Sequence, residues 1–437
     1  MKRLILTLVT SYMALCINAE DYDYGYLYCF MNSQTEITNF ALGSKEDRGT
    51  RFNVLINGNP VFDVVSNTNE GGTRDSFIAR GREGGPNYLM VTTDMCQHSS
   101  GKWENYGIDL LRSNDLIHWY SKTFDFRNGK KIFSNPRDMV DIFSSNQAYA
   151  LIYRVWAPQI IWDKEAEKWM VYYSILSSAN GDRYDKIYYS YADSTFTTLT
   201  QPQVLIDLGC STIDADIVYC EKDRKYHCFL KRTTDKSSTT GNCQYVSDKL
   251  VDGNWTETLF INEKEPACEA PTLLKLIGED VWNLYFMRYS NGVAYKYLTL
   301  NNRLLNPSNA TPLQGKGNFQ HGSMMTVSEM EYRMLELWSQ AYLKKNEIEK
   351  IPTASRTNNE KILFSKIRSA MNKTTVEKLY NAFVEIDSII TSIDGITVDK
   401  PQISNTGIYD FNGRKISETT LPTKGIFIRD GKKYLVK

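Results

Sequence analysis

Short stretches in which apolar and polar residues alternate, separated by turn residues, fill most of the chain up to about residue 335. A hydrophobic period of two predicts β-strands. One unit recurs: an apolar strand, a tight turn and a second strand rich in aromatic residues, which together are typical of a β-hairpin. The four copies of this hairpin begin at Asp75, Ala157, Asp214 and Glu269.

A further strand that ends near a serine follows each hairpin, as in residues 108–113 and 187–190. Repeated four-stranded units with little helical periodicity predict a β-propeller. The four hairpins give four blades. We expect a fifth to begin near His321 and to be completed by strands near residues 25–30 and 40–42, which would leave no open edge strand. A pair of β-sandwiches is the alternative, and the fourfold repetition favours the propeller.

The hydrophobic period changes to a helical one after about residue 327, and Thr374 with Glu377 matches a capping box at the start of the last helix. From about Gly395 the chain returns to short strands, with Asn-Gly and Asp-Gly turns at 412–413 and 430–431. We therefore predict an all-β fold. It comprises a five-bladed propeller at residues 20–335, a short helical segment at 336–395 and a small β tail at 396–437.

The first nineteen residues have the pattern of a secretory signal peptide. Lys2 and Arg3 precede an apolar run that ends at Ala19, and the run is short for a membrane span. This predicts a secreted or extracytoplasmic protein, in the periplasm or on the outer cell surface. Cys16 suggests a lipid anchor as an alternative, which Leu15 disfavours because lipoprotein processing needs a small residue there. No later stretch predicts a transmembrane segment.

Composition narrows the function classes. With 42% hydrophobic and 12% aromatic residues the chain is too apolar to be disordered or fibrous. Lys+Arg and Asp+Glu both number 51, so the chain has no basic excess, which argues against nucleic acid as a partner. The seven cysteines beyond the predicted signal include no C-x-x-C pair, which argues against a zinc site and a disulfide framework. One or two disulfides among the group of cysteines from Cys210 to Cys268 stay open. We expect a monomer.

Carboxylic acids recur where the predicted blades begin. The first strand of a propeller blade lines the central channel, so the residues that open the five hairpins should face a common axis: Asp75, Ala157, Asp214, Glu269 and His321. Acids that converge on a channel repel one another, and this raises the pKa of one of them. Hydrolysis of a glycosidic bond needs such a set, one protonated acid and one carboxylate. A gap of about 6.5–9.5 Å between them admits a water and gives inversion.

Several of these phrases resemble the blade-start motifs of glycoside hydrolase family 43. The resemblance covers roughly residues 22–335 and rests on Arg74-Asp75-Ser-Phe-Ile, Arg112-Ser113-Asn-Asp115-Leu-Ile-His-Trp119, Trp156-Ala157-Pro158-Gln-Ile, Ile213-Asp214-Ala-Asp-Ile, Glu269-Ala-Pro271 and His321-Gly-Ser323. It implies a five-bladed propeller that acts on arabinose- and xylose-containing polysaccharides. The expected substrates are arabinan, arabinoxylan or oligosaccharides derived from them.

The resemblance also implies roles for single residues. Asp75 matches the general base, Glu269 the general acid, and Asp214 the aspartate that tunes the pKa of the acid. His321 matches an axial histidine beside a calcium ion, and no other cofactor is expected. The candidate substrate-binding residues are Phe77, Trp156 and Arg288, and Asp216 is the alternative to Asp214.

The chain departs from the family pattern next to each acid. Ser76 and Ala215 stand where the family often has proline, and Ala270 stands where it often has glycine. These changes affect the backbone around the acids and leave all three carboxyl groups in place.

Two hypotheses about function follow. The first is an arabinofuranosidase, arabinanase or xylosidase, and the second is a catalytically silent propeller that binds glycans or proteins. The segment from Gly407 to Lys437 resembles the sorting tail of type IX secretion substrates, and a small accessory hairpin is the alternative.

Overall fold

The structure is a computed structural model. It describes residues 22–62, 70–126, 152–177, 184–233, 241–260, 268–289, 292–300, 303–304 and 310–393, and four short strands near the C-terminus. The predicted signal peptide and both predicted C-terminal turns lie outside the described residues.

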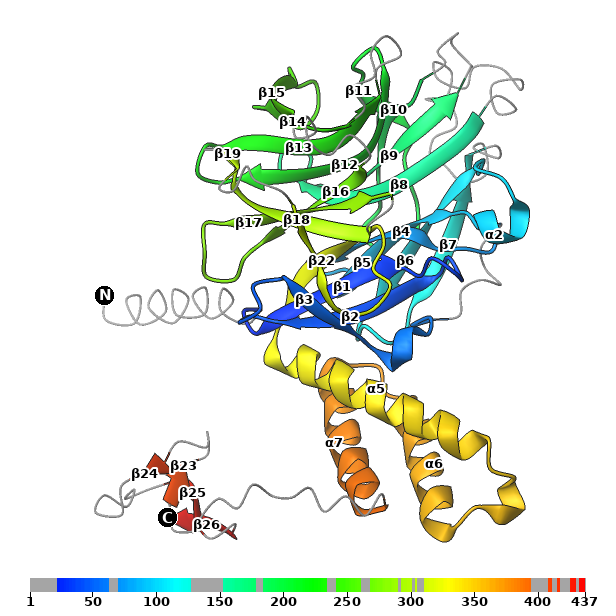
Figure 1. Cartoon of the computed structure of the whole chain (residues 1–437), viewed down its shortest axis with the longest axis vertical. Coiled ribbons are helices and arrows are strands. Elements are labelled where there is room, and N and C mark those ends of the chain that lie inside the picture. The colour runs from blue at the N-terminus through cyan, green and yellow to red at the C-terminus, as the bar shows by residue number, and fades with distance from the viewer. Residues whose placement is uncertain are drawn as a thin grey trace, which may run out of the picture.

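Antiparallel groups of four strands are the repeating unit of the first part of the chain (Figure 1). The first group is β4 (Arg74–Arg80), β5 (Tyr88–Asp94), β6 (Gly107–Ser113) and β7 (Tyr120–Asp125), and the second is β8 (Ile152–Asp163), β9 (Lys168–Ser177), β10 (Lys186–Tyr191) and β11 (Gln203–Ile206). The third is β12 (Ser211–Cys220), β13 (Lys225–Thr233), β14 (Gly241–Ser247) and β15 (Thr256–Phe260). The fourth is β16 (Cys268–Lys275), β17 (Trp282–Arg288), β18 (Gly292–Thr299) and β19 (Arg303–Leu304), and β20 (Thr311–Pro312) also pairs with β18.

The fifth group joins the two ends of this region. Its strands are β22 (Gly322–Val327), β1 (Gly25–Met31), β2 (Thr38–Ser44) and β3 (Arg51–Val54), with β21 (Gln314–Lys316) added in parallel to β3. Antiparallel pairing of β22 with β1 confirms the prediction that the N-terminal strands complete the last group.

The prediction of a mostly β protein is confirmed, but five separate sheets are not observed. The fifth and first groups merge into one nine-stranded sheet, because Gly322 of β22 pairs in parallel with Ser76 of β4. The innermost strands contact one another in the order β4, β8, β12, β16, β22 and again β4. Apolar clusters fill the space between neighbouring groups and include the fully buried Val171, Cys228 and Leu284.

Helices follow β22: α5 (Glu329–Glu349), α6 (Asn358–Ala370) and α7 (Val376–Ile393), in addition to the short α2 (Gln97–Ser100), η1 (Ile56–Gly58) and η5 (Thr353–Ser355). α5 begins before residue 336, where we drew the boundary, because Ser328 and Glu331 form a capping box there. The last helix is preceded by Thr375, whose hydroxyl accepts the Lys378 N–H at 3.4 Å. The cap is therefore one residue later than the predicted Thr374.

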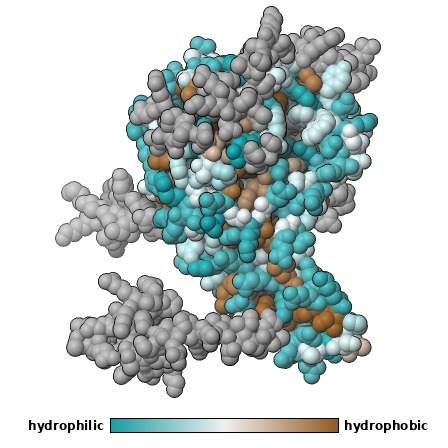
Figure 2. Space-filling model, in the orientation of Figure 1, coloured by the Kyte–Doolittle hydropathy of each residue, from teal (hydrophilic) through white to brown (hydrophobic). Residues whose placement is uncertain are grey.

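The helical layer packs against the β part and shares its largest apolar core. Leu27 of β1, Trp338 of α5 and Phe383 of α7 belong to one buried cluster. The Ser339 hydroxyl accepts the backbone N–H of Ile56 at 2.7 Å. On the face drawn in Figure 2, apolar side chains gather over the helical layer, whereas the surface of the β part is mostly polar. Among the described residues, no helix has both the length and the apolar character to cross a membrane.

A buried carboxylate joins the two layers. Glu331 accepts two hydrogen bonds from the Arg80 guanidinium, at 2.7 and 3.1 Å, and further ones from the Tyr88 hydroxyl and the Ser328 N–H. Burial raises the pKa of Glu331, but the bonds and charge of Arg80 outweigh it, and the pKa is lowered overall. This ion pair should therefore hold α5 against β4.

Glu331→Gln is expected to reduce the free energy of unfolding by about 2 kcal/mol near neutral pH, because it leaves the half-buried Arg80 charge without its partner. A carboxyl group whose pKa is lower in the folded state stabilises the fold above its unfolded pKa of about 4.3, and this stabilisation disappears as the pH falls through the folded value. Urea denaturation at about pH 7 and about pH 3 should therefore show a large difference from wild type at the higher pH only. Glu329→Gln, at an exposed acid in the same helical turn, is the control. An equal effect of both substitutions would contradict the prediction.

The described strands near the C-terminus form a separate small sheet with the order β24-β23-β25-β26. The strands are β23 (Ile408–Asp410), β24 (Lys415–Ile416), β25 (Gly425–Arg429) and β26 (Lys432–Val436).

Candidate active site

A β-bulge at the start of the inner strands sets the direction of the functional side chains. In β4, β8, β12 and β16 the pairing register shifts at the bulge, where one residue has positive φ: Asp75 (53°), Ala157 (47°), Asp214 (56°) and Ala270 (55°). Aspartate tolerates this left-handed conformation better than most residues. Asp75 and Asp214 are therefore structurally equivalent.

The hairpin starts predicted that Glu269 is equivalent to Asp75 and Asp214, and this prediction is wrong. Ala270 stands at the bulge of β16, and Glu269 lies one residue before it. The error arose because the sequence repeat was aligned on the acids, whereas the backbone repeat is aligned on the bulge. Glu269 therefore starts from a different position in its strand than the two aspartates do in theirs.

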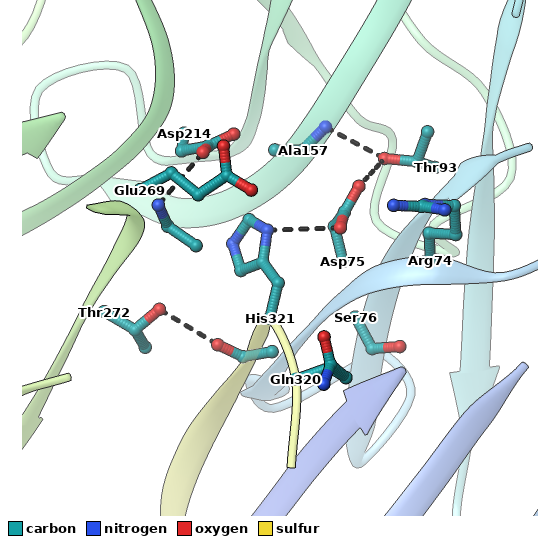
Figure 3. A network of polar contacts seen from close by, with 12 residues as sticks. Arg74, Asp75, Ser76, Thr93, Ala157, Asp214, Glu269, Thr272, Gln320 and His321 are labelled. Carbon is teal, nitrogen blue, oxygen red and sulfur yellow. Dashed lines mark hydrogen bonds and ion pairs between the residues drawn. The ribbon is translucent and has the colours of Figure 1, made fainter. Parts of the chain in front are cut away.

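The structure nevertheless brings the predicted acids together. Asp75, Asp214, Glu269 and His321 line one cavity of about 470 Å³. Figure 3 shows the His321 imidazole between Asp75 and the pair formed by Asp214 and Glu269. A larger cavity, of about 1070 Å³, lies between the first strand group and the helices α5 and α7, and none of these four residues lines it.

Asp75 is held as a carboxylate. Its Oδ2 accepts the Thr93 hydroxyl at 2.8 Å and its Oδ1 lies 3.1 Å from His321 Nδ1. Burial alone raises the pKa of Asp75, but the charge and hydrogen bond of His321, the charge of Arg74 and the Thr93 bond together lower it to about 2. The same ion pair, opposed by burial, raises the pKa of His321 to about 9. At neutral pH the two therefore form a carboxylate–imidazolium pair.

Asp214 has the opposite tendency. Burial, followed by the lesser contributions of Glu269 and Asp75, raises its pKa to about 6, against the lowering charges of His321 and Lys231. Its Oδ2 accepts the backbone N–H of Ala270 at 3.0 Å, the residue next to Glu269. Asp214 thus combines a backbone link to the Glu269 segment with a proton affinity higher than that of Asp75.

Two donors that the sequence analysis missed hold Glu269. Its Oε2 accepts the Lys231 ammonium at 2.8 Å and the Tyr289 hydroxyl at 2.8 Å, and these two donors also contact each other. Burial lowers the pKa of Lys231, but Glu269 and Asp214 raise it above its usual value. The only sequence signal for Lys231 was a cation that directly follows the apolar run Phe229-Leu230.

Of the two aromatic residues predicted to bind substrate, one lines the cavity and the other does not. Trp156 lines the cavity, with the Arg154 guanidinium 4.1 Å from its ring centroid and Trp103 edge-on at 6.4 Å. Phe77 does not line it and packs against the core between the first and second strand groups.

Arg288 does not line the cavity either, whereas its neighbours Met287 and Tyr289 do. Adjacent residues of an extended strand point to opposite faces, so the cavity receives the two positions that flank Arg288. Tyr289 therefore takes the place in the site that we had predicted for Arg288.

Asp216, the alternative to Asp214, is a structural residue. Its Oδ2 accepts the Leu273 N–H at 2.7 Å, which ties β12 to β16, and burial raises its pKa to about 7. It does not line the cavity.

The channel side chains do not fit the calcium ion that the family resemblance implied. Calcium takes six to eight oxygen ligands. Here the carboxylates of Asp75 and Glu269 already accept two donors each, and His321 Nδ1 already faces Asp75 Oδ1 at 3.1 Å. In the described part of the chain these four residues form no group close enough to share an ion. We derive no step through a metal.

Comparison with known proteins decides the family. Residues 20–333 match the model of a glycosyl hydrolase 43-related family described as "Probable glycosyl hydrolase domain". The chain belongs to this family. The match ends within α5, before α6, α7 and the small C-terminal sheet, and these comparisons give no support to a type IX sorting tail.

The individual proteins that resemble this chain have low sequence identity to it. An α-L-arabinofuranosidase of Bifidobacterium longum subsp. longum is 23% identical over 247 residues, which cover 52% of this chain and only 20% of that protein. The chain therefore spans a small part of that relative. An α-L-arabinofuranosidase from Lactobacillus brevis has 14% identity, coverage of 59% of this chain and 80% of that one, and a TM-score of 0.39. An exo-β-1,3-galactanase from Phanerochaete chrysosporium has 14% identity, coverage of 56% and 52%, and a TM-score of 0.40.

Proposed function

We propose that this chain is a secreted, monomeric glycoside hydrolase that cleaves arabinose- or xylose-containing polysaccharides or oligosaccharides with inversion. We propose further that its strand groups act as the blades of a five-bladed propeller around the site. The observation that carries the proposal is the single cavity lined by Asp75, Asp214 and Glu269, in which each carboxyl group has a different set of partners.

In this proposal Asp75 is the general base. A base must be ionised at the working pH and must point at a water on the face of the sugar opposite the leaving group. The low pKa of Asp75 meets the first requirement, and its bonds to Thr93 and His321 fix its orientation. His321 is then a positioning residue that keeps the base charged.

Glu269 is the proposed general acid. A general acid donates a proton to the glycosidic oxygen as the bond breaks, and Asp214, which accepts the backbone N–H of the residue next to Glu269, helps to orient that segment. Lys231 and Tyr289 position the Glu269 carboxyl group at the cavity wall. Tyr289 is 58% exposed, so a bound sugar can displace its hydroxyl from Glu269.

Arabinose is the favoured sugar, because the Bifidobacterium relative is named an α-L-arabinofuranosidase. The exposed face of Trp103, beside Trp156, offers an apolar surface for a sugar ring at the cavity.

A glycan-binding module without turnover is the second candidate. The ion pair between Lys231 and Glu269 favours it, because the Lys231 ammonium, at 2.8 Å, already occupies the Glu269 oxygen Oε2. A substrate must therefore weaken this pair if the first proposal is correct.

The test is a panel of arabinan, arabinoxylan, xylan and β-1,3-galactan with the matching nitrophenyl glycosides, followed by reducing-sugar release and by ¹H NMR of the first product. We expect turnover on the arabinose-containing members and a product of inverted anomeric configuration. Turnover with retained configuration would reject Asp75 as base. Calorimetric binding of an oligosaccharide without any turnover would favour the binding module.

A further inference from the structure

The hairpin between β12 and β13 brings together three side chains of types that can bind a metal ion, and they are separate from the candidate active site. Cys220 is the last residue of β12, Asp223 lies in the turn, and His227 is the third residue of β13. One donor atom from each, the Cys220 sulfur, an Asp223 carboxylate oxygen and a His227 ring nitrogen, all lie within 4.8 Å of one another. None of the three lines the cavity that holds Glu269.

Strand pairing explains why they meet. Cys220 pairs with Lys225 across the hairpin, so their side chains share a face of the sheet, and His227 lies two residues further on that same face. Arg224, at φ 58°, closes the turn, and its N–H donates to the Cys220 carbonyl at 2.9 Å. The turn thus carries Asp223 back over the two side chains.

The donors are held in place by neighbours. Asp223 Oδ1 accepts the Lys225 N–H at 3.1 Å, and Asp223 Oδ2 lies 3.0 Å from His227 Nε2. The other ring nitrogen of His227, Nδ1, lies 2.9 Å from the Gln244 side-chain amide. An outer partner of this kind orients a histidine that binds a metal.

We propose that Cys220, Asp223 and His227 bind one Zn²⁺ ion, with a water as fourth ligand. Thiolate, imidazole and carboxylate are the three ligand types that zinc takes in proteins, and copper or cobalt would compete for the same set. Ligand atoms in a tetrahedral zinc site lie roughly 3.3–3.8 Å apart. Asp223 Oδ2 and His227 Nε2 are already 3.0 Å apart, and no two of the donor atoms are more than 4.8 Å apart, so the largest approach needed is about 1 Å. Cys220 and Asp223 are partly exposed, which leaves a path for the ion and room for the water.

Binding of the ion changes the protonation of Cys220 and His227. The Cys220 thiol loses its proton to solvent, and its sulfur bonds to the metal. The Nε2 proton of the neutral His227 ring is lost while Nδ1 gains one, and the Gln244 amide turns its oxygen toward Nδ1–H. The Asp223 carboxylate exchanges its hydrogen bond with His227 for a bond to the metal. One proton is therefore released for each ion bound.

The spacing also explains why the sequence analysis argued against zinc. That reasoning looked for C-x-x-C pairs. Here the ligands follow the spacing Cys-x₂-Asp-x₃-His around a single hairpin, with one cysteine. All seven cysteines in the described part of the chain carry thiols rather than disulfides, so Cys220 is not committed to a disulfide.

The test is titration of the full chain, stripped with EDTA, first with Co²⁺ and then with Zn²⁺. We expect one equivalent of Co²⁺ to give a thiolate-to-cobalt charge-transfer band and tetrahedral d–d bands, both abolished by one equivalent of Zn²⁺. Calorimetry in two buffers of different ionisation enthalpy should report about one proton released. Absence of the charge-transfer band would overturn the proposal.

Substitution of the proposed ligands distinguishes Zn²⁺ binding at this site from adventitious Zn²⁺ binding elsewhere on the protein. Cys220→Ser and Asp223→Asn, both at partly exposed positions, should weaken Zn²⁺ binding by about 100-fold or more, whereas Cys210→Ser, at another partly exposed cysteine, should not change it. Circular dichroism checks that each variant is folded, and Zn²⁺ should raise the melting temperature of wild type but not of Cys220→Ser. Equal affinity in Cys220→Ser and wild type would refute the assignment. Glycosidase activity is not needed for any of these readouts.

Discussion

Asp75→Asn is expected to lower kcat on a natural polysaccharide by about 10⁴-fold while the protein stays folded. The amide cannot take a proton from the attacking water, so the step assigned to the general base is lost. Asparagine is among the residues that tolerate the left-handed backbone at φ 53°, and its side-chain oxygen can still accept the Thr93 hydroxyl. The effect should therefore come from chemistry and not from backbone strain.

The measurement is initial-rate release of reducing sugar from the best substrate of the panel, with thermal denaturation as a check on folding. Asp207→Asn is the matched control. Asp207 also forms an ion pair, with the Lys186 ammonium at 2.8 Å, but it does not line the cavity. The control should therefore keep wild-type activity. A loss of less than tenfold in Asp75→Asn would remove Asp75 from the mechanism.

The sequence alone was sufficient to predict which carboxyl groups meet. Asp75 and Asp214 stand at the same point of a repeated hairpin, and the structure places both at the same bulge. The pairing of β22 with β1 was also predictable, since the last repeat lacked strands that the N-terminus could supply. Local periodicity carries this information because each repeat forms the same local structure.

Side-chain direction was not predictable from the sequence. Phe77 lies two residues after Asp75, which in a regular strand would place both on one face. The register shift between Arg74 and Phe77 breaks that alternation, and Phe77 packs in the core. A bulge leaves little mark in the sequence when aspartate or alanine, and not glycine, occupies the positive-φ position.

The hydrogen-bond partners of Glu269 could not be predicted from the sequence for a different reason. Lys231 comes from β13 and reaches Glu269 only through packing of the third group against the fourth. Tyr289 follows β17, which pairs with β16, and it meets Glu269 beside the register shift of that pair. Contacts between strands far apart in sequence do not follow from hairpin periodicity. For the same reason the merging of the first and fifth groups, through one pair between Gly322 and Ser76, could not be predicted.

Glu269→Gln is expected to slow hydrolysis of natural polysaccharides by about 10³-fold and to slow hydrolysis of nitrophenyl glycosides much less. A sugar leaving group needs a proton as the bond breaks, whereas nitrophenolate leaves without one. Glutamine has nearly the same shape, and its oxygen can still accept from Lys231 and Tyr289. The ratio of the two losses therefore reports the acid role itself.

The same comparison tests the opposing interpretation of the Lys231 ion pair. Glu257→Gln is the matched control, because Glu257 also pairs with a cation, Arg232, and does not line the cavity. If Glu269 donates the proton, Glu269→Gln changes the dependence of rate on leaving group and Glu257→Gln does not. If Glu269 stays paired with Lys231 and donates no proton, the substitution slows both substrate classes equally. Glu269 would then be a binding residue, and the proton would have to come from Asp214, whose pKa of about 6 makes it the nearer donor at neutral pH.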